Sequence, residues 1–411
     1  MKIYYNILLV GYKLVTELIF FISRPILWLI LPLFNYRESI IIPESNNDNP
    51  VLIHCSSVGE LNAIIPLVRH LIKEGIPLII NTVTVTGRDL AKRQFPELRV
   101  TLAPLDFASL RFKQIKAISP RLIIVVETEI WPMMLDISAR MNVAIIFINA
   151  RMSDKSLDRY LRMKGLLRYL GRNVQLVLAQ SKDDQQRFKK IWNTRVLAAG
   201  NLKYCLQLTQ YDNLKTREKL GFKKNDKILV WGSSRPGEEN LLMTIFPSLK
   251  AEIPNLRVIL APRHPKRCDE VERMLIEYEY CKLSELSNGS LYEILLIDGL
   301  GYLDKAYAIS DLAVVGGSFY NFGGHNPLEP AFYGKAIIIG EYHASCKSSV
   351  NKLAQNKALV VSSIRTLQQD IIKLLKNDTM REEMGKRAKI VLTENAEALE
   401  NHIKGIMKCL P

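Results

Sequence analysis

The stretch DLAVVGGSFYNFGGHNPLEPAFYGKAIIIGE, residues Asp311–Glu341, decides the fold expected for this chain. The apolar run Leu312–Val315 predicts a buried strand that ends at Gly316-Gly317-Ser318, and Ile337–Ile339 predicts the next strand. Between them, the segment Asn326–Glu329 predicts a helix N-terminus with proline at its first position and asparagine as its cap. A glycine-lined helix N-terminus after a parallel strand is a natural site for an anion. The alternative is a tight turn without a ligand, but the polar loop favours a ligand.

The same alternation of short apolar runs and helical segments extends outward through the chain. The alternation begins at Val51, is absent from the polar stretch Asn201–Asn225, and is present again from Ile228. Continuous apolar strands separated by helices predict parallel α/β sheets that are covered on both faces. A length of 411 residues is too great for one ordinary core. We therefore expect two Rossmann-like domains facing a cleft, residues 38–205 and residues 206–411, with the terminal helices in the second.

The N-terminal segment, residues 1–37, is expected to associate with a membrane. Ile3–Phe34 is strongly apolar, but charged residues interrupt it, and its longest uncharged run, Pro25–Tyr36, is shorter than the roughly 18 residues of a confident span. One interpretation is a marginal signal anchor. The other is an amphipathic segment in the interface whose cations lie at the headgroups, namely Lys2, Lys13, Arg24 and Arg37. A buried core helix is the remaining alternative, and Ile40–Pro50 is expected to be a linker.

Composition narrows the class of partner and of chemistry. The net charge of +15 suggests nucleic acid, an anionic membrane surface or a phosphorylated substrate. No RNA-binding signature or DNA-binding helix pair stands out, so nucleic acid is not expected. The six cysteines are scattered without a C-x-x-C motif, and neither D-x-D nor H-E-x-x-H occurs. We therefore expect no metal and no cofactor.

Two acidic segments follow predicted strands of the first half. Glu60 comes after the strand at Val51 and is placed to accept a proton from a hydroxyl group, although Ser57 to Glu60 also fits a capping box. These two interpretations compete evenly. Glu127-Thr128-Glu129 follows another strand, where Glu129 is either a site residue or a helix cap ahead of Pro132.

Cationic segments occur in both halves. Lys203 lies at the expected domain junction, and Arg263-His264 follows a strand of the second half, where arginine is suited to a phosphate. A basic stretch, Arg151–Arg172, is either a solvated helix face or a contact for anionic lipid or substrate phosphates.

Seven motifs, taken in their order along the chain, resemble those of one family, the 3-deoxy-D-manno-octulosonic acid (Kdo) transferases of lipopolysaccharide assembly. The motifs are SVGE at Ser57–Glu60, ETEIWP at Glu127–Pro132, NARMS at Asn149–Ser153, QS at Gln180-Ser181, GNLKY at Gly200–Tyr204, PRHP at Pro262–Pro265 and VGGSFYNFGGHNPLEP at Val315–Pro330. The resemblance implies a two-domain GT-B glycosyltransferase that needs no metal. Its donor would be CMP-Kdo, its acceptor a lipid A precursor (lipid IVA), and its location the cytoplasmic side of the inner membrane.

The resemblance also implies roles for particular residues. Glu60 would be the general base, and Glu129 and Lys203 would stabilise the transition state. The residues implied in binding CMP are Arg263, His264, Leu300, Gly301, Tyr302, Asn326, Pro327, Leu328 and Glu329. The chain departs from the family at Leu300-Gly301-Tyr302, where members often carry Met-Gly-Glu, so we expect backbone contacts there. A GT-B-like nucleotide-sugar epimerase is the alternative function.

Overall fold

The computed structural model describes residues 2–30, 49–206, 208–287 and 290–410. Two compact units are distinguished within it, residues 1–205 with 395–411, and residues 206–394. Each unit contains one seven-stranded parallel sheet, so the expected α/β class is confirmed. Most of the linker expected at Ile40–Pro50 lies outside the described residues.

The first sheet has the strand order β3-β2-β1-β4-β5-β6-β7, with every pair parallel. Its strands are β1 (Val51–Cys55), β2 (Leu78–Thr82), β3 (Arg99–Leu102), β4 (Leu122–Val126), β5 (Ala144–Ala150), β6 (Val174–Ala179) and β7 (Arg195–Ala198). The helices between them are α2 (Val58–Lys73), α3 (Val85–Gln94), α4 (Ala108–Ile118), α5 (Pro132–Arg140), α6 (Asp154–Arg162), α7 (Lys164–Leu170) and α8 (Lys182–Ile191). The basic stretch Arg151–Arg172 thus contains two short helices, α6 and α7, which meet at Met163.

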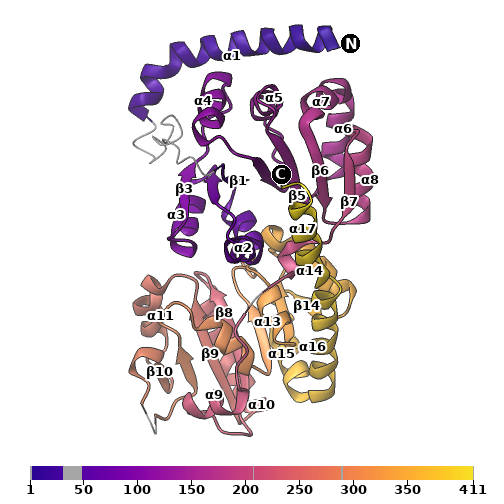
Figure 1. Cartoon of the computed structure of the whole chain (residues 1–411). Coiled ribbons are helices and arrows are strands. Elements are labelled where there is room, and N and C mark those ends of the chain that lie inside the picture. Colours follow the sequence, from indigo (N-terminus) through magenta and orange to yellow (C-terminus); the bar gives the residue numbers. More distant parts are fainter. Residues whose placement is uncertain (1, 31–48, 207, 288–289, 411) are drawn as a thin grey trace. The chain divides into compact units, whose positions relative to one another are not determined.

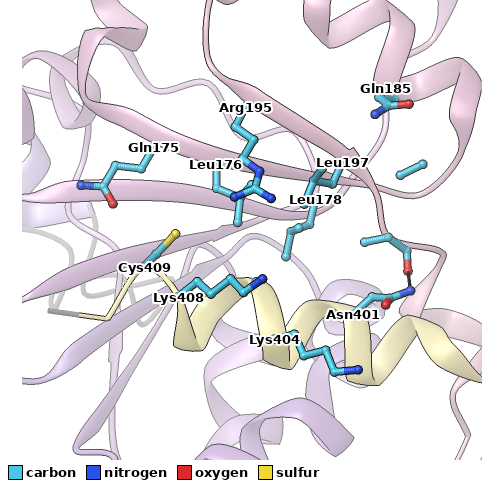
Figure 2. Close-up of a pocket in the computed structure, with 13 residues that line it drawn as sticks. Gln175, Leu176, Leu178, Gln185, Arg195, Leu197, Asn401, Lys404, Lys408 and Cys409 are labelled. Carbon is cyan, nitrogen blue, oxygen red and sulfur yellow. Dashed lines mark hydrogen bonds between the residues drawn. The ribbon is translucent and has the colours of Figure 1, made fainter.

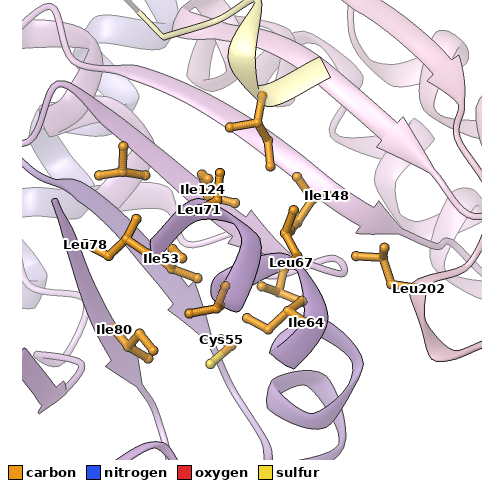
Figure 3. Packing of buried hydrophobic residues seen from close by; sticks show 14 of the residues in the cluster. Ile53, Cys55, Ile64, Leu67, Leu71, Leu78, Ile80, Ile124, Ile148 and Leu202 are labelled. Carbon is orange, nitrogen blue, oxygen red and sulfur yellow. The ribbon is translucent and has the colours of Figure 1, made fainter. Parts of the chain in front are cut away.

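Alternate residues of these strands face opposite sides of the sheet, as the period of two in a strand requires. Ile53 and Ile124 pack on one side with α2, as Figure 3 shows. Their sequence neighbours Leu52 and Ile123 pack on the other side with α4 and α5. Burial on both faces explains why the strands read as uninterrupted apolar runs.

The second sheet has the order β10-β11-β9-β8-β12-β13-β14 and is also parallel. Its strands are β8 (Lys227–Ser234), β9 (Leu256–Pro262), β10 (Tyr280–Lys282), β11 (Ile294–Leu296), β12 (Leu312–Val315), β13 (Ala336–Gly340) and β14 (Leu359–Ser362). The helices of this unit are α9 (Asn213–Lys219), α10 (Glu238–Glu252), α11 (Cys268–Met274), α12 (Leu303–Ile309), α13 (Leu328–Phe332), α14 (Lys347–Gln355), α15 (Leu367–Lys376) and α16 (Asp378–Thr393).

The last helix, α17 (Glu397–Met407), differs from the expected domain division because it belongs to the first unit. Ile406 is fully buried there and packs with Leu176 and Leu178 of β6. Figure 2 shows α17 lying beside the strands that carry Leu178 and Leu197. The physical reason is the apolar face of α17, which covers the face of β6 opposite to the one that α8 covers.

The first helix, α1 (Lys2–Ile30), packs along α4 and α7 with one face only. Leu9 is buried there, and the ring of Phe20 stacks on Phe107 at 4.5 Å. Lys13 Nζ lies 2.6 Å from Asp136 Oδ2, a fully buried carboxylate, so Lys13 is not at a headgroup as expected.

The opposite face of α1 is apolar and exposed. Its exposed side chains are Tyr4, Ile7, Leu8, Val10, Tyr12, Leu14, Val15, Leu18, Ile19, Phe21, Ile22 and Ile26. This exposure removes the interpretation of α1 as a buried core helix. None of the helices described is sufficiently long and apolar to cross a bilayer.

Candidate functional site

Glu60 stands in the first turn of α2, directly after β1, and only 8% of it is exposed. Its carboxylate accepts hydrogen bonds from Ser56 N at 2.6 Å and from Ser57 Oγ at 3.2 Å, and Glu60 N donates to Ser57 Oγ at 3.3 Å. Ser57 therefore caps α2, but the predicted capping box is only half formed, because the Glu60 side chain reaches back to the N–H of Ser56 rather than to that of the cap residue. Burial, together with the nearby carboxylates of Glu127 and Glu129, raises the pKa of Glu60 to about 7. A carboxylate with that pKa is suited to accept a proton near neutral pH, so the cap and the base are compatible roles.

The second carboxylate of this edge is Glu127, which directly follows β4 and has a left-handed backbone (φ 56°). It is 6% exposed and holds two cations. Lys203 Nζ lies 2.8 Å from Glu127 Oε1, and Arg151 Nε donates to Glu127 Oε2 at 2.8 Å. Lys203 and Glu129 were predicted together as site residues, whereas no role was predicted for Glu127. The only signal for Glu127 was its position as the first polar residue after the strand.

Glu129 does not cap α5. Its Oε2 accepts from Trp131 Nε1 at 2.8 Å, which places that indole beside the acidic group. The cap of α5 is Asp106, whose two oxygens accept from Met133 N at 2.9 Å and Met134 N at 3.0 Å. The interpretation of Glu129 as a helix cap is therefore wrong, because a carboxylate from a distant loop already occupies that position.

The strand order explains why these residues gather. The strands β1, β4, β5, β6 and β7 are consecutive neighbours, and parallel strands end at the same edge of a sheet. Glu60 follows β1, Glu127 follows β4, Arg151 follows β5 and Lys203 follows β7. The first unit thus presents three carboxylates and two cations along one edge.

In the second unit, the glycine turn after β12 is occupied from within the protein. The carboxylate of Glu238, fully buried at the start of α10, accepts from Gly317 N at 2.7 Å, Ser318 N at 2.9 Å and Phe319 N at 3.0 Å. These amides were expected to be free for an anionic ligand. Glu238 satisfies them instead, so a ligand at this edge requires other donors.

Those donors are arginine and histidine side chains from three neighbouring loops, namely Arg235, Arg263, His264 and His325. Arg235 Nη1 donates to His264 Nε2 at 2.8 Å. The pKa of His325 is lowered to about 4, mainly by burial and then by the neighbouring Arg263, Arg235 and His264. Gly317 (φ 68°) cannot be replaced without strain, because a Cβ there would approach the His325 ring within 2.8 Å. Arg263 and His264 were predicted from the sequence, whereas Arg235 and His325 were not assigned a role.

The remaining predicted donor residues lie at two short helices. Asn326 Oδ1 accepts from Leu328 N at 3.1 Å, but α13 begins at Leu328, one residue later than expected, so its N-cap is Pro327 and not the predicted Asn326. Leu300 is 80% exposed, and Gly301 has φ 85°, at the head of α12. Because α12 packs against α13, the structure brings the segments 300–302 and 326–329 to the same region of the second unit.

A pocket of about 560 Å³ lies elsewhere, between α17 and the strands β6 and β7 (Figure 2). None of the residues predicted for the site lines it. It has an apolar floor that includes Leu176 and Leu178, with Arg195, Lys404 and Lys408 around it.

Comparison with known proteins assigns the family. A family model described as 3-Deoxy-D-manno-octulosonic-acid transferase (kdotransferase) matches residues 35–206. The 3-deoxy-D-manno-octulosonic acid transferase of Haemophilus influenzae is 31% identical over 366 residues, which cover 85% of this chain and 84% of that protein. The chain belongs to the Kdo transferase family.

A Kdo transferase assignment agrees with the other similarities. A bifunctional glycosyltransferase/methyltransferase of Fusobacterium nucleatum is 31% identical over 84% of this chain, but the chain spans only 56% of that protein. A glycosyltransferase of Rickettsia africae has the same fold, with a TM-score of 0.55 and 15% identity over 89% of this chain and 99% of that one. The expected GT-B fold is therefore confirmed, and membership of this family makes the chain a glycosyltransferase, so the epimerase alternative is set aside.

Proposed function

We propose that this Kdo transferase family member transfers Kdo from CMP-Kdo to a lipid A precursor, with lipid IVA as the acceptor. The observation that carries the proposal is the Glu60 carboxyl, with a pKa of about 7, beside Glu127 and Glu129 at the edge of the first sheet. An acceptor hydroxyl needs a base that is ionised at neutral pH yet able to bind its proton. Glu60 has both properties.

The proposed reaction divides the work between the units. Glu60 takes the proton of the acceptor hydroxyl, the oxygen forms a bond to the anomeric carbon of Kdo, and the bond from that carbon to the CMP phosphate breaks. CMP leaves with the negative charge. Arg263, Arg235 and His264 in the second unit offer it charge-assisted hydrogen bonds, with the Leu300–Tyr302 and Asn326–Glu329 segments around the nucleotide. Lys203, held by Glu127, adds positive charge on the acceptor side.

We also propose that the exposed apolar face of α1 lies on the cytoplasmic surface of the inner membrane. An amphipathic helix that buries its apolar face in the headgroup region suits an enzyme whose acceptor is a lipid. Arg159, Arg162 and Arg168 are exposed on α6 and α7 and would add attraction to anionic lipids.

Vesicle flotation of a variant with Leu14 and Phe21 changed to serine tests this orientation. The variant should fold but no longer bind anionic vesicles, and unchanged flotation would contradict the orientation.

The direct test of the reaction combines the purified chain, CMP-Kdo and a tetraacylated lipid A precursor. Release of CMP together with a lipid whose mass has increased by Kdo is the expected result. Hydrolysis of CMP-Kdo with an unmodified lipid would reject the proposed acceptor. Conversion of a nucleotide sugar to its epimer without any lipid would favour the alternative enzyme class.

A further inference from the structure

The last helix of the chain contacts the two loops that carry the candidate catalytic cations. His402 of α17 is completely buried. Its Nδ1 lies 2.7 Å from the carbonyl oxygen of Ala398, and its Nε2 lies 3.0 Å from Asn149 N. A carbonyl oxygen only accepts, so Nδ1 carries the proton and Nε2 accepts from Asn149. Burial lowers the pKa of His402 to about 4, so this neutral form persists at physiological pH.

Asn149 joins three loops at the edge of the first sheet. It is fully buried and has a left-handed backbone (φ 49°), a conformation that the surrounding contacts must maintain. Its carbonyl oxygen accepts from Gln180 Nε2 at 2.9 Å, and its Oδ1 accepts from Leu202 N at 3.0 Å. Arg151 follows it by two residues and binds Glu127.

The contacts continue to Lys203. Gln180 Oε1 accepts from Asn201 Nδ2 at 3.0 Å, and Asn201 Oδ1 accepts from Lys203 N at 2.9 Å. The helix also touches this loop directly: Gly200 has φ 92°, and a Cβ there would lie 2.7 Å from Ala398 Cβ. Both cations that bind Glu127 therefore depend on segments held by α17.

We propose that His402 is a positioning residue, which sets the geometry of the Lys203–Glu127–Arg151 cluster through Asn149. The inference rests on the proposed function for its effect on turnover, but the positioning of Lys203 is a structural property that is measurable without substrate. Neither the predicted site residues nor the family motifs quoted above include His402.

The test compares three variants. His402→Leu removes the acceptor and leaves Asn149 N–H unpaired, His402→Gln restores an acceptor at the end of a side chain of similar length, and Ile406→Ala weakens the packing of the same helix without touching Asn149. We expect H402L to lower kcat at least tenfold with the KM for CMP-Kdo unchanged, H402Q to recover most of the loss, and I406A to lower the melting temperature but keep kcat. In a Lys203→Met background, H402L should cause little further loss.

A readout without activity separates this inference from the proposed function. Reductive methylation followed by peptide mass spectrometry measures the accessibility of Lys203, which should rise several-fold in H402L and not in I406A. Equal Lys203 labelling in wild type and H402L would overturn the positioning role even if the chain proved inactive. So would a kcat loss in I406A equal to that of H402L. If H402L does not fold, His402→Asn, whose amide is too short to reach Asn149 N, takes its place.

Discussion

Replacing Glu60 by Gln should make the protein inactive and, at alkaline pH, more stable. Glu60 has a pKa of about 7 in the folded chain, against an ordinary value of 4.5. Because the folded chain binds this proton more tightly, the wild type is most stable, with respect to this group, below pH 4.5 and loses stability as the pH rises to 7. At about 1.4 kcal/mol per pH unit, the ionised Glu60 carboxylate lowers the free energy of unfolding by about 3 kcal/mol above pH 7.

The glutamine variant removes this cost but loses a contact. An amide offers one oxygen, so it cannot accept from both Ser56 N and Ser57 Oγ, which removes about 1 kcal/mol. The expected effect of Glu60→Gln is a net gain of about 2 kcal/mol at pH 8 and a net loss of about 1 kcal/mol at pH 4, where Glu60 is mostly protonated in both states. Unfolding midpoints of the two proteins at both pH values measure it. An equal difference at pH 4 and pH 8 would refute the raised pKa.

The same variant tests catalysis. A missing general base should lower kcat roughly a hundredfold or more, while CMP binding stays unchanged. In the wild type, kcat should rise with pH through about 7, since only about one tenth of Glu60 is ionised at pH 6. A Glu60→Gln protein with more than a tenth of wild-type turnover would refute the assignment of the base.

Four further predictions follow from the same geometry. Glu127→Gln should lower kcat roughly tenfold to a hundredfold by releasing its two cations, whereas Asp154→Asn, which removes a surface ion pair, should leave kcat unchanged. Asp136→Asn should destabilise α1 docking by about 2 kcal/mol or more, seen as faster hydrogen exchange of α1; unchanged exchange would contradict the role of the ion pair. Arg235→Ala should weaken CMP binding about tenfold in calorimetry, with exposed Arg273→Ala as the unaffected control. EDTA should leave transfer activity unchanged, and an activity restored only by added metal would contradict the expected metal independence.

The strands that the sequence predicted well are those buried on both faces. β4 and β12 are fully buried and read as apolar runs, so their positions follow from composition alone. The short strands β7 and β10 were not predicted because they are partly exposed and carry Arg195 and Lys282 within them. Their pairing depends on the neighbouring strand rather than on their own residues.

The site was predictable to the extent that strand ends define it. Glu60 and Arg263 were found because polar residues after apolar runs mark the carboxyl edge of a parallel sheet. Lys203 was found from its place at the expected domain junction and from the family resemblance. The pairing of Lys203 with Glu127 depends on a left-handed backbone that no sequence pattern indicated. The bonds from Glu238 to the glycine turn join residues about 80 positions apart, and the bond from Asn149 N to His402 joins residues 253 positions apart. Neither contact leaves a local signal in the sequence.

The discontinuity of the first unit has a consequence for synthesis on the ribosome. Residues 206–394 form a separate compact unit and emerge before α17 does. The core of the first sheet therefore stays incomplete until the entire second unit has been translated, because the side of β6 on which Ile406 packs is uncovered until then. The nascent chain should thus complete its second half first, and the amino-terminal half should be the part that chaperones protect.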